Sequence, residues 1–430
     1  MRKLLVFIYA GALLTTASAG SAQTLTTLYD FTGSAGAYPD GLVHGPGGTL
    51  LGATTYGGAG NFGAVFQLSP PATAAGTWTE NAIYSFTGKA DGAVPGGVLV
   101  VGNAIYGTTL QGGNSFNSGC SKPGKIGCGI IFQLSPPATA GSPWTKTTVY
   151  TFAGGADGAA PTMLVPGVNG VLYGVTQNGG GSSKCVDLGN EVPGCGTVFQ
   201  LTPPAAAGQA WTETVLHAFQ GGSDSAFPES VQVLANGELI GPTLGIGGQD
   251  FGTVFALTPP AAPGGAWTKA VLHRFTGGSD GDGPVGKLIE GKNGQLYGTT
   301  LNGGLPGFGV VYELTRPAGA GLAWTEQVLY AFQGGSDGSY PSSGLTRGPN
   351  GAFFGTTGGT YSVSQGQYLD GTAFVLEPPS ISGGLWTEKV LYLFAADLPA
   401  GLLMGGHQTL YGFTVNGGTS QNGEVFQLTY

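Results

Sequence analysis

The sequence predicts an all-β fold: a seven-bladed β-propeller of four-stranded blades, closed by the N-terminal strand joining the C-terminal blade. The chain has 430 residues, of which 84 are glycine and 27 are proline, and this excludes a helix-rich fold because both residue types disfavour helices. Three short apolar motifs each recur seven times. The first motif copy and the end of the chain also belong to one repeat, which predicts how the ring closes.

The repeat has a basic period of 57 residues. The Leu-Tyr-Gly-Thr-Thr motif at 296–300 and its relatives occur seven times and share a glycine, which stands at positions 52, 107, 174, 241, 298, 355 and 412. A Val-Phe-Gln-Leu motif, as at 65–68, and a Leu-Tyr-x-Phe motif, as at 28–31, also occur seven times when their variants are included. Self-similarity at a fixed period of this length indicates a repeat architecture.

Each repeat is expected to form four short strands, because apolar residues alternate between clusters of Gly, Pro and Asn. In one unit these strands are expected near 344–346, 352–357, 372–376 and 386–394. Asn350-Gly351, between the first two strands, is a strong hairpin signal, since both central positions of a type I′ turn need φ > 0. Four strands in each of seven repeats predict a propeller.

The two ends of the chain predict a blade that is split between the termini. The strand at 26–31 has no second or third strand before it, and Tyr430 follows the last Val-Phe-Gln-Leu motif. Tryptophan opens six of the fourth strands, at Trp78, Trp144, Trp211, Trp267, Trp324 and Trp386. The N-terminal strand therefore completes the last blade, and the closed ring leaves no exposed sheet edge. A linear β-solenoid is the alternative, but it needs capping ends.

Residues 1–22 are expected to be a signal peptide, and residues 23–430 a single domain. Met1-Arg2-Lys3 is a basic start, an apolar run follows at 4–14, and small residues at 17–22 offer cleavage sites. The apolar run is too short to span a bilayer. We therefore expect a protein secreted to the periplasm or the extracellular space, without a transmembrane segment in the mature chain.

The four cysteines fall in two close pairs, which predicts the disulfides Cys120–Cys128 and Cys185–Cys195 in an oxidising compartment. A zinc site built from the four thiolates is the alternative, but the spacings within the pairs do not match zinc knuckles. No metal and no cofactor are expected. The net charge of −9 argues against a nucleic-acid partner, whose phosphates bind basic surfaces. A monomer is expected.

The repeat resembles the Gloeo/Verruco (GloVer) tandem repeat of exported bacterial proteins. The likeness rests on Leu-Tyr-Gly-Thr-Thr, Gly-Gly, Gly-Thr-Val-Phe and Gly-Gly-Ser-Asp-Gly elements, as at 296–300, 303–304, 252–255 and 277–281. It covers nearly the whole mature chain. The resemblance implies an exported repeat protein and carries no established activity or catalytic residues. Nothing follows the final strand, so we expect no C-terminal anchor.

Candidate ligand-binding residues lie in the turns that follow the fourth strands. An aspartate recurs five residues after the strand's Phe, at Asp91, Asp157, Asp224, Asp280 and Asp337. These carboxylates are expected to line one face of the ring, where they could bind a cation or a polar ligand. We favour the alternative that each aspartate caps its own turn. One carboxylate in each loop falls short of the six to eight oxygens that Ca²⁺ needs.

The same face is expected to carry two hairpins that are longer than the others and contain the cysteine pairs. Lys122, Lys125 and Lys184 lie in these insertions, and loops on a rigid scaffold commonly carry binding residues. The alternative is that an insertion of this size is simply tolerated. Phe62, Phe251 and Phe308 end hairpins of the same kind, and we favour packing between blades over stacking against sugars.

The residues point to a secreted, non-enzymatic scaffold that binds an extracellular glycan or protein through one propeller face. No catalytic residues are predicted, because the four His and the few Arg form no metal or catalytic pattern. The alternative is an extracellular polysaccharide-active hydrolase or lyase with acidic residues at the central channel. A structural surface-layer component is a third hypothesis. Near-regular repeats favour the scaffold, since an active site usually breaks the symmetry.

Overall fold

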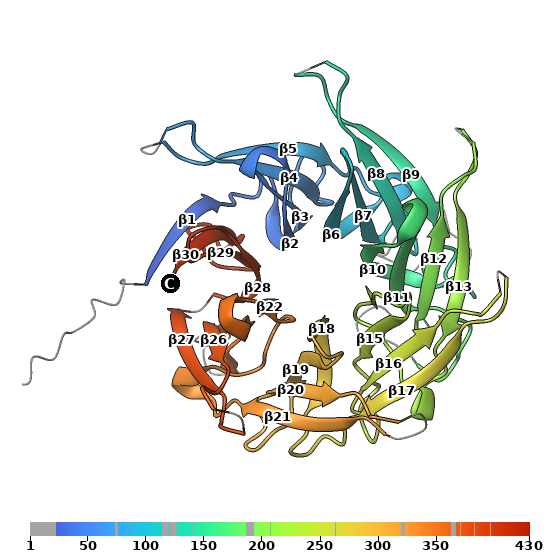
Figure 1. Cartoon of the computed structure of the whole chain (residues 1–430). Coiled ribbons are helices and arrows are strands. Elements are labelled where there is room, and N and C mark those ends of the chain that lie inside the picture. Colours follow the sequence, from blue (N-terminus) through green and yellow to red (C-terminus); the bar gives the residue numbers. More distant parts are fainter. Residues whose placement is uncertain are drawn as a thin grey trace, which may run out of the picture.

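The computed structural model describes residues 23–430 except 74–75, 114–119, 121–126, 140, 186–192, 207, 263, 320–322, 363–366, 370, 382 and 396. Seven four-stranded antiparallel sheets stand in a ring (Figure 1), which confirms the predicted seven-bladed propeller. The residues predicted to be a signal peptide lie outside the described part, so that expectation stays a prediction. Within the described residues, no helix is long and apolar enough to cross a membrane.

The blades follow one another along the chain, and in each the strands run from the centre outward. Blades 1 to 3 consist of β2 (Ala37–His44), β3 (Leu50–Tyr56), β4 (Ala64–Ser69) and β5 (Thr79–Ser85); β6 (Ala93–Val101), β7 (Ala104–Gln111), β8 (Ile130–Ser135) and β9 (Thr145–Thr151); and β10 (Ala159–Pro166), β11 (Leu172–Asn178), β12 (Thr197–Thr202) and β13 (Thr212–Ala218). Blades 4 and 5 consist of β14 (Gln232–Val233), β15 (Leu239–Thr243), β16 (Thr253–Thr258) and β17 (Thr268–Arg274); and β18 (Asp282–Glu290), β19 (Leu296–Asn302), β20 (Val310–Thr315) and β21 (Thr325–Ala331).

Blades 6 and 7 complete the ring. They consist of β22 (Thr346–Arg347), β23 (Phe353–Thr357), β26 (Gly371–Glu377) and β27 (Thr387–Phe394), and of β28 (Pro399–Met404), β29 (Thr409–Thr414), β30 (Glu424–Thr429) and β1 (Thr24–Asp30). A small hairpin of β24 (Thr360–Ser362) and β25 (Gln367–Leu369) lies between β23 and β26. Short 3₁₀ turns lie at Pro46–Gly48, Lys89–Asp91, Val168–Gly170, Gly222–Asp224, Gly335–Asp337 and Pro349–Gly351.

The N-terminal strand closes the ring, as predicted. β1 pairs antiparallel with β30, with Leu25 opposite Leu428 and Asp30 opposite Glu424. The seventh tryptophan is missing, and an aromatic ring of the last residue takes its place: Tyr430 packs on Phe354 of the neighbouring blade with ring centroids 4.6 Å apart. Backbone pairing thus joins the two chain ends, and side-chain packing of Tyr430 joins the last blade to blade 6.

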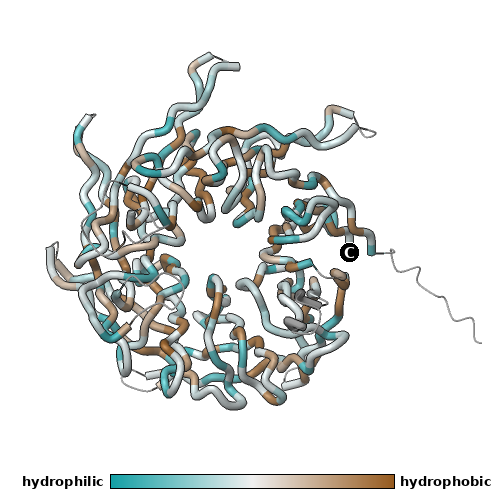
Figure 2. Tube along the Cα trace, turned by 180° about the vertical axis from the view of Figure 1, so that it is seen from behind, coloured by the Kyte–Doolittle hydropathy of each residue, from teal (hydrophilic) through white to brown (hydrophobic). Residues whose placement is uncertain are grey.

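The hydrophobic core lies between the blades and is spread around the whole ring (Figure 2). At each junction a buried aromatic ring that ends the outer strand meets an aromatic ring on the third strand of the next blade, with centroids 5.1–5.3 Å apart; the pairs are Phe31–Phe66, Phe86–Phe132, Phe152–Phe199, Phe219–Phe255, Phe275–Tyr312, Phe332–Phe374 and Phe394–Phe426. Edge-to-face pairs add to the hydrophobic gain of burial.

The recurring glycine of the second strand makes room for this core. A Cβ at Gly107 would stand 2.4 Å from the Cζ of Phe132 on the neighbouring strand, and one at Gly412 would stand 2.4 Å from that of Phe426. Only glycine fits beneath the ring, which explains why this glycine recurs in every blade.

The ring has two distinct faces. The connections between blades contact the hairpins between second and third strands: Gly113 N donates to Lys89 O at 2.8 Å, and Gly304 N donates to Gly278 O at 2.8 Å. We call this side the turn face. The opposite side carries the other two hairpins of each blade, and we call it the groove face.

Candidate functional sites on the faces and the axis

Each of the five predicted aspartates caps its own turn on the turn face. Their carboxylates accept a hydrogen bond at 2.8–2.9 Å from the backbone N–H four residues earlier, in the pairs Thr87–Asp91, Ala153–Asp157, Gln220–Asp224, Thr276–Asp280 and Gln333–Asp337. The outer strand adds a second donor, such as the Tyr84 hydroxyl to Asp91 at 2.7 Å. These contacts account for the side-chain positions, so a role of the aspartates in ligand binding stays a prediction.

The aspartates also face one position on the outer strand of the next blade. At two junctions this position holds a lysine: Lys146 lies 2.9 Å from Asp91, and Lys269 lies 2.6 Å from Asp224. Burial would raise the pKa of Asp91, but hydrogen bonds from Lys146 and Tyr84 hold it below its usual value. The junctions therefore carry partly buried ion pairs.

At three other junctions the same position holds a glutamate. Glu213, Glu326 and Glu388 face Asp157, Asp280 and Asp337, and burial followed by the charge of the facing aspartate raises the pKa of each glutamate to about 7. The Oε1 atom of each glutamate is buried and has no hydrogen-bond partner. At these three junctions two carboxyl groups therefore lie side by side, whereas at the junctions of Lys146 and Lys269 a lysine lies beside a carboxylate.

Both predicted disulfides are present, Cys120–Cys128 and Cys185–Cys195. The second cysteine of each pair stands directly before the hairpin glycine, which is where Phe62, Phe251 and Phe308 stand in other blades. The three rings pack beneath the glycines of the adjoining turns, such as Phe62 beneath Gly88. The Cys185 and Cys195 sulfurs occupy the same place beneath Gly221.

The favoured packing role of Phe62, Phe251 and Phe308 is therefore confirmed, and in blade 3 a disulfide substitutes for such a ring. Of the predicted lysines, Lys122 and Lys125 lie outside the described residues. Lys184 is exposed and lies next to Gly221, at the start of the turn that contains Asp224. The structure thus brings one stapled loop and one aspartate turn together.

Two carboxyl groups meet at the axis of the ring, and Lys287 lies on another inner strand. Asp40 on β2 and Lys287 on β18 are exposed, yet the surrounding protein desolvates them, raising the pKa of Asp40 and lowering that of Lys287. Desolvation and then the Asp40 charge raise the pKa of Glu229 to about 7, although a hydrogen bond from Gln177 opposes this shift. Asp40 belongs to blade 1 and Glu229 precedes β14 of blade 4, so the two carboxyls interact across the axis.

No residue at the axis was predicted from the sequence, although the repeats contain a signal for two of them. Asp40 and Glu229 each follow the proline that begins an inner strand, a position that holds Gly96, Thr162, Val285, Ser342 or Ala400 in the other blades. These two acids are the ionisable residues at that repeat position. Aligning the repeats on this proline would have found them.

The groove face carries pockets at four consecutive junctions, between blades 3 and 4, 4 and 5, 5 and 6, and 6 and 7. Three of the pockets have a tryptophan of one blade, a proline of the hairpin beside it and polar groups of the preceding blade; the tryptophans are Trp267, Trp324 and Trp386. In the fourth pocket, Tyr430 of blade 7 lies opposite prolines and polar side chains of blade 6. The three tryptophans are half-buried, so part of each indole stays accessible. From the sequence, these tryptophans were predicted only to open the fourth strands and not to line a site.

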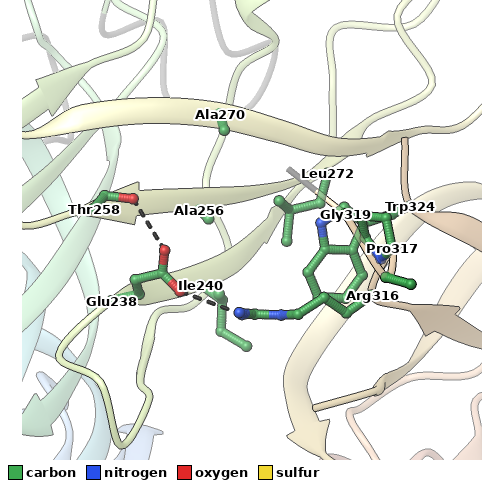
Figure 3. A pocket seen from close by; sticks show the side chains of 11 residues that line it. Glu238, Ile240, Ala256, Thr258, Ala270, Leu272, Arg316, Pro317, Gly319 and Trp324 are labelled. Atoms are coloured by element: carbon green, nitrogen blue, oxygen red, sulfur yellow. Dashed lines mark hydrogen bonds and ion pairs between the residues drawn. The ribbon is translucent and has the colours of Figure 1, made fainter. Parts of the chain in front are cut away.

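The groove between blades 4 and 5 has a volume of about 380 Å³ (Figure 3). Glu238 lies on one side and Arg316 on the other, 3.3 Å apart, and the guanidinium lies 5.3 Å from the Trp324 ring centre. The Thr258 hydroxyl donates to the second Glu238 oxygen at 3.0 Å. Ile240 and Leu272 form the apolar wall. This groove is therefore amphipathic, with its charges paired.

The groove between blades 5 and 6 is larger, about 740 Å³. Its lining contains the rings of Tyr297, Phe353 and Trp386, and the Phe353 and Trp386 rings are stacked with centroids 5.6 Å apart. Lys292 and Arg347 supply positive charge. Side-chain amides of Asn293, Gln295 and Asn350 complete the polar lining.

The fold defines a class of protein, the seven-bladed propeller, and solved structures of low identity share it. A catalytically inactive virginiamycin B lyase from Staphylococcus aureus, crystallised with quinupristin, is 13% identical with a TM-score of 0.53, over 95% of this chain and 99% of that one. YCF48 from Cyanidioschyzon merolae is 11% identical with a TM-score of 0.52, over 94% and 98%. A puromycin-hydrolysing peptidase of Mycobacterium tuberculosis is 13% identical with a TM-score of 0.54, over 92% of this chain but 52% of that one. At these identities the likeness shows the fold alone.

The particular family follows from the repeat itself. The model of the Gloeobacter/Verrucomicrobia repeat matches residues 9–189, 119–365 and 186–426. The chain therefore belongs to this repeat family, as its motifs predicted. No curated protein matches the chain.

Proposed function

We propose that this protein is a secreted, non-enzymatic scaffold that binds an extracellular glycan through the grooves between its blades. The observation that carries the proposal is the recurrence of one groove composition, an aromatic ring beside proline and polar side chains, at four consecutive junctions. Aromatic rings offer apolar faces to sugar rings, and polar side chains at the edge bind hydroxyl groups.

Repetition of the grooves suits a ligand that itself repeats. A polymer that occupies two neighbouring grooves gains avidity without any new contact, because the second binding event is intramolecular. Many glycans are polymers of repeating sugar units and therefore suit such a row of grooves. The groove face is therefore proposed as the ligand-binding face in place of the turn face, which was predicted from the sequence.

The test is a glycan array probed with the purified mature protein, followed by titration calorimetry with the glycan that binds. Trp267→Ala and Trp386→Ala each remove one aromatic wall and are expected to weaken binding about tenfold, which corresponds to about 1.4 kcal/mol. The Trp→Phe variants keep an aromatic face and are expected to retain most of the affinity. Thermal melting of every variant shows whether the junctions stay packed.

The control variant acts on the turn face. Replacing the insertion at 112–129 with the short hairpin at 303–309 leaves the grooves intact and is expected to leave binding unchanged. If this replacement abolishes binding while the tryptophan variants bind normally, the ligand occupies the turn face and the groove assignment is wrong.

A second candidate function, a polysaccharide hydrolase or lyase, is favoured by the acid pair at the axis. A pKa raised to about 7, as for Glu229, suits a carboxyl group to general acid catalysis near neutral pH, and a second carboxylate such as Asp40 can act as the base. Incubating the protein with the glycan that binds, and measuring new reducing ends and unsaturated products, tests this function. Loss of product formation in both Asp40→Asn and Glu229→Gln would support it, and an intact polymer after incubation with the native protein would exclude it.

A further inference from the structure

We propose that the groove between blades 5 and 6 binds a sugar unit that carries a carboxylate, such as a uronic acid. The inference rests on the proposed glycan-binding function and names the class of ligand for one groove. It follows from three observations: unpaired positive charge in this groove, an aromatic wall beside it, and the different charge balance of the neighbouring grooves.

The two cations of this groove have no acidic partner. Lys292 and Arg347 are both exposed, and neither forms an ion pair with a carboxylate in the described part of the chain. The Arg347 side chain is nevertheless held in place, because its Nη2 donates to the Glu290 carbonyl at 2.6 Å and its guanidinium lies 5.8 Å from the Phe353 ring centre. An oriented guanidinium loses little side-chain entropy when it binds a carboxylate in a bidentate manner.

The carboxyl group beside Tyr297 of the groove lining is engaged elsewhere. Glu313 accepts a hydrogen bond from the Tyr297 hydroxyl, and burial followed by this carboxylate raises the pKa of Tyr297 to about 12. Thr315 also donates to Glu313, at 3.1 Å. The Tyr297 hydroxyl therefore stays protonated, and Glu313 has partners other than the groove cations.

The aromatic wall places apolar surface next to these cations. Trp386 is half-buried, with the Tyr297 ring centre 6.5 Å and the Phe353 ring centre 5.6 Å from its own. A pyranose lying along this wall can direct its ring carbons to the aromatic surface and its carboxylate to Arg347 or Lys292. The amides of Asn293 and Asn350 line the same groove and can bind its hydroxyl groups.

The neighbouring grooves lack this excess of positive charge. Between blades 4 and 5, Arg316 is paired with Glu238 at 3.3 Å, and between blades 6 and 7, Lys389 is paired with Glu377 at 2.6 Å. The lining of the groove between blades 3 and 4 contains no charged residue. Two unpaired cations in one groove of a protein with net charge −9 therefore mark a local site for an anion, since long-range repulsion is screened by salt.

The experiment compares a panel of uronate oligosaccharides with their carboxyl-reduced counterparts, which keep the backbone and lose the charge. Titration calorimetry on the mature protein is expected to show at least tenfold tighter binding of one or more uronates than of the reduced forms. Arg347→Gln and Lys292→Gln are expected to weaken uronate binding about tenfold each and to leave binding of the reduced forms unchanged. The matched controls Lys89→Gln and Lys89→Met remove the same charge from the turn face, away from the grooves, and are expected to leave uronate binding unchanged.

Equal affinity for charged and reduced forms, no binding of the panel, or equal losses in the control variants would each overturn the inference. The proposed function fails separately, when the glycan array shows no binding of any kind. If a neutral glycan binds in the grooves and uronates do not, the proposed glycan-binding function is supported and only the uronate inference is wrong.

Discussion

At five of the seven junctions between blades, a single position on the outer strand decides which charged group faces the turn aspartate. It lies three residues before the leucine of the Leu-Tyr-x-Phe motif and is occupied by Leu25, Glu80, Lys146, Glu213, Lys269, Glu326 and Glu388. A lysine there neutralises the turn aspartate of the preceding blade, whereas a glutamate places a second carboxyl beside it. The same backbone thus carries an ion pair in one junction and a carboxyl group of raised pKa in another.

The glutamates at this position predict that stability falls as the pH rises. Burial raises the pKa of Glu213, Glu326 and Glu388 from 4.5 to about 7. A carboxyl group whose pKa is higher in the folded state stabilises the fold fully below its unfolded pKa, and this contribution is lost as the pH rises through the folded value. The melting temperature is therefore expected to decrease between pH 5 and pH 8.

The triple variant E213Q/E326Q/E388Q replaces the three carboxyl groups with amides, which are neutral at every pH. Its melting temperature is therefore expected to depend less on pH than that of the native protein. Its difference from the native profile isolates these three groups from His273, whose pKa burial lowers, and from Glu229. Glu377→Gln, which removes an exposed carboxylate, is the control and is expected to follow the native protein. Parallel profiles for the native protein and the triple variant would contradict this account.

At the scale of the element, the space beneath the turn glycine is filled in two different ways by the hairpin between the second and third strands. Phe62, Phe251 and Phe308 fill the space beneath a turn glycine with a ring, and Cys185–Cys195 fills it with a disulfide in a longer loop. Both arrangements bury an apolar group. In both, the carbonyl of the residue before the hairpin glycine accepts a hydrogen bond from the backbone that leads into the next blade: Val94 N donates to Phe62 O at 3.0 Å, and Phe227 N donates to Cys195 O at 2.9 Å.

This equivalence predicts that a short hairpin can replace a stapled one. Replacing 112–129 with 303–309 removes the Cys120–Cys128 disulfide but supplies Phe308, so the free energy of unfolding is expected to change by only about 1 kcal/mol. Replacing both cysteines with serine in the long loop leaves no apolar filler and is expected to cost roughly 2–3 kcal/mol. Urea unfolding measures both. A replacement less stable than the serine variant would show that the loop itself, and not its apolar filler, is required.

At the scale of the whole molecule, one strand pairing converts a row of repeats into a closed ring. β1 pairs with β30 along its length and contributes the buried Leu28 and Phe31. Phe31 packs on Phe66 of blade 1, so the strand also carries the core across the junction between the first and last blades. Closure removes the sheet edge that would otherwise be open to pairing with other chains.

Deleting residues 23–31 is therefore expected to destabilise the whole propeller. Loss of a buried leucine costs roughly 2–5 kcal/mol and loss of a buried phenylalanine roughly 3–5 kcal/mol, and the freed edge of β30 favours aggregation. Thermal melting with light scattering measures both effects. Thr26→Ala, at an exposed position of β1, is the control and is expected to melt like the native protein. A deletion variant that melts at the native temperature and stays monomeric would refute closure as a source of stability.

The amino-acid sequence by itself determined the seven repeats, the four strands of each blade, the split blade and the two disulfides. Those features depend on local alternation, turn residues and short spacings, which are readable along the chain. The role of Phe62 beneath Gly88 was also predictable, because a glycine beside each ring left room for it.

Only the tertiary structure decided which charged groups meet. Asp40 and Glu229 face each other across the axis from non-adjacent blades, Glu213 meets Asp157 across one junction, and Arg347 joins Lys292 in one groove. The partners in each case belong to different blades and lie about one repeat or more apart in the chain. Their approach depends on the tilt and spacing of whole blades around a closed ring, and that geometry is set by the packing of all seven junctions together and not by any local pattern of residues.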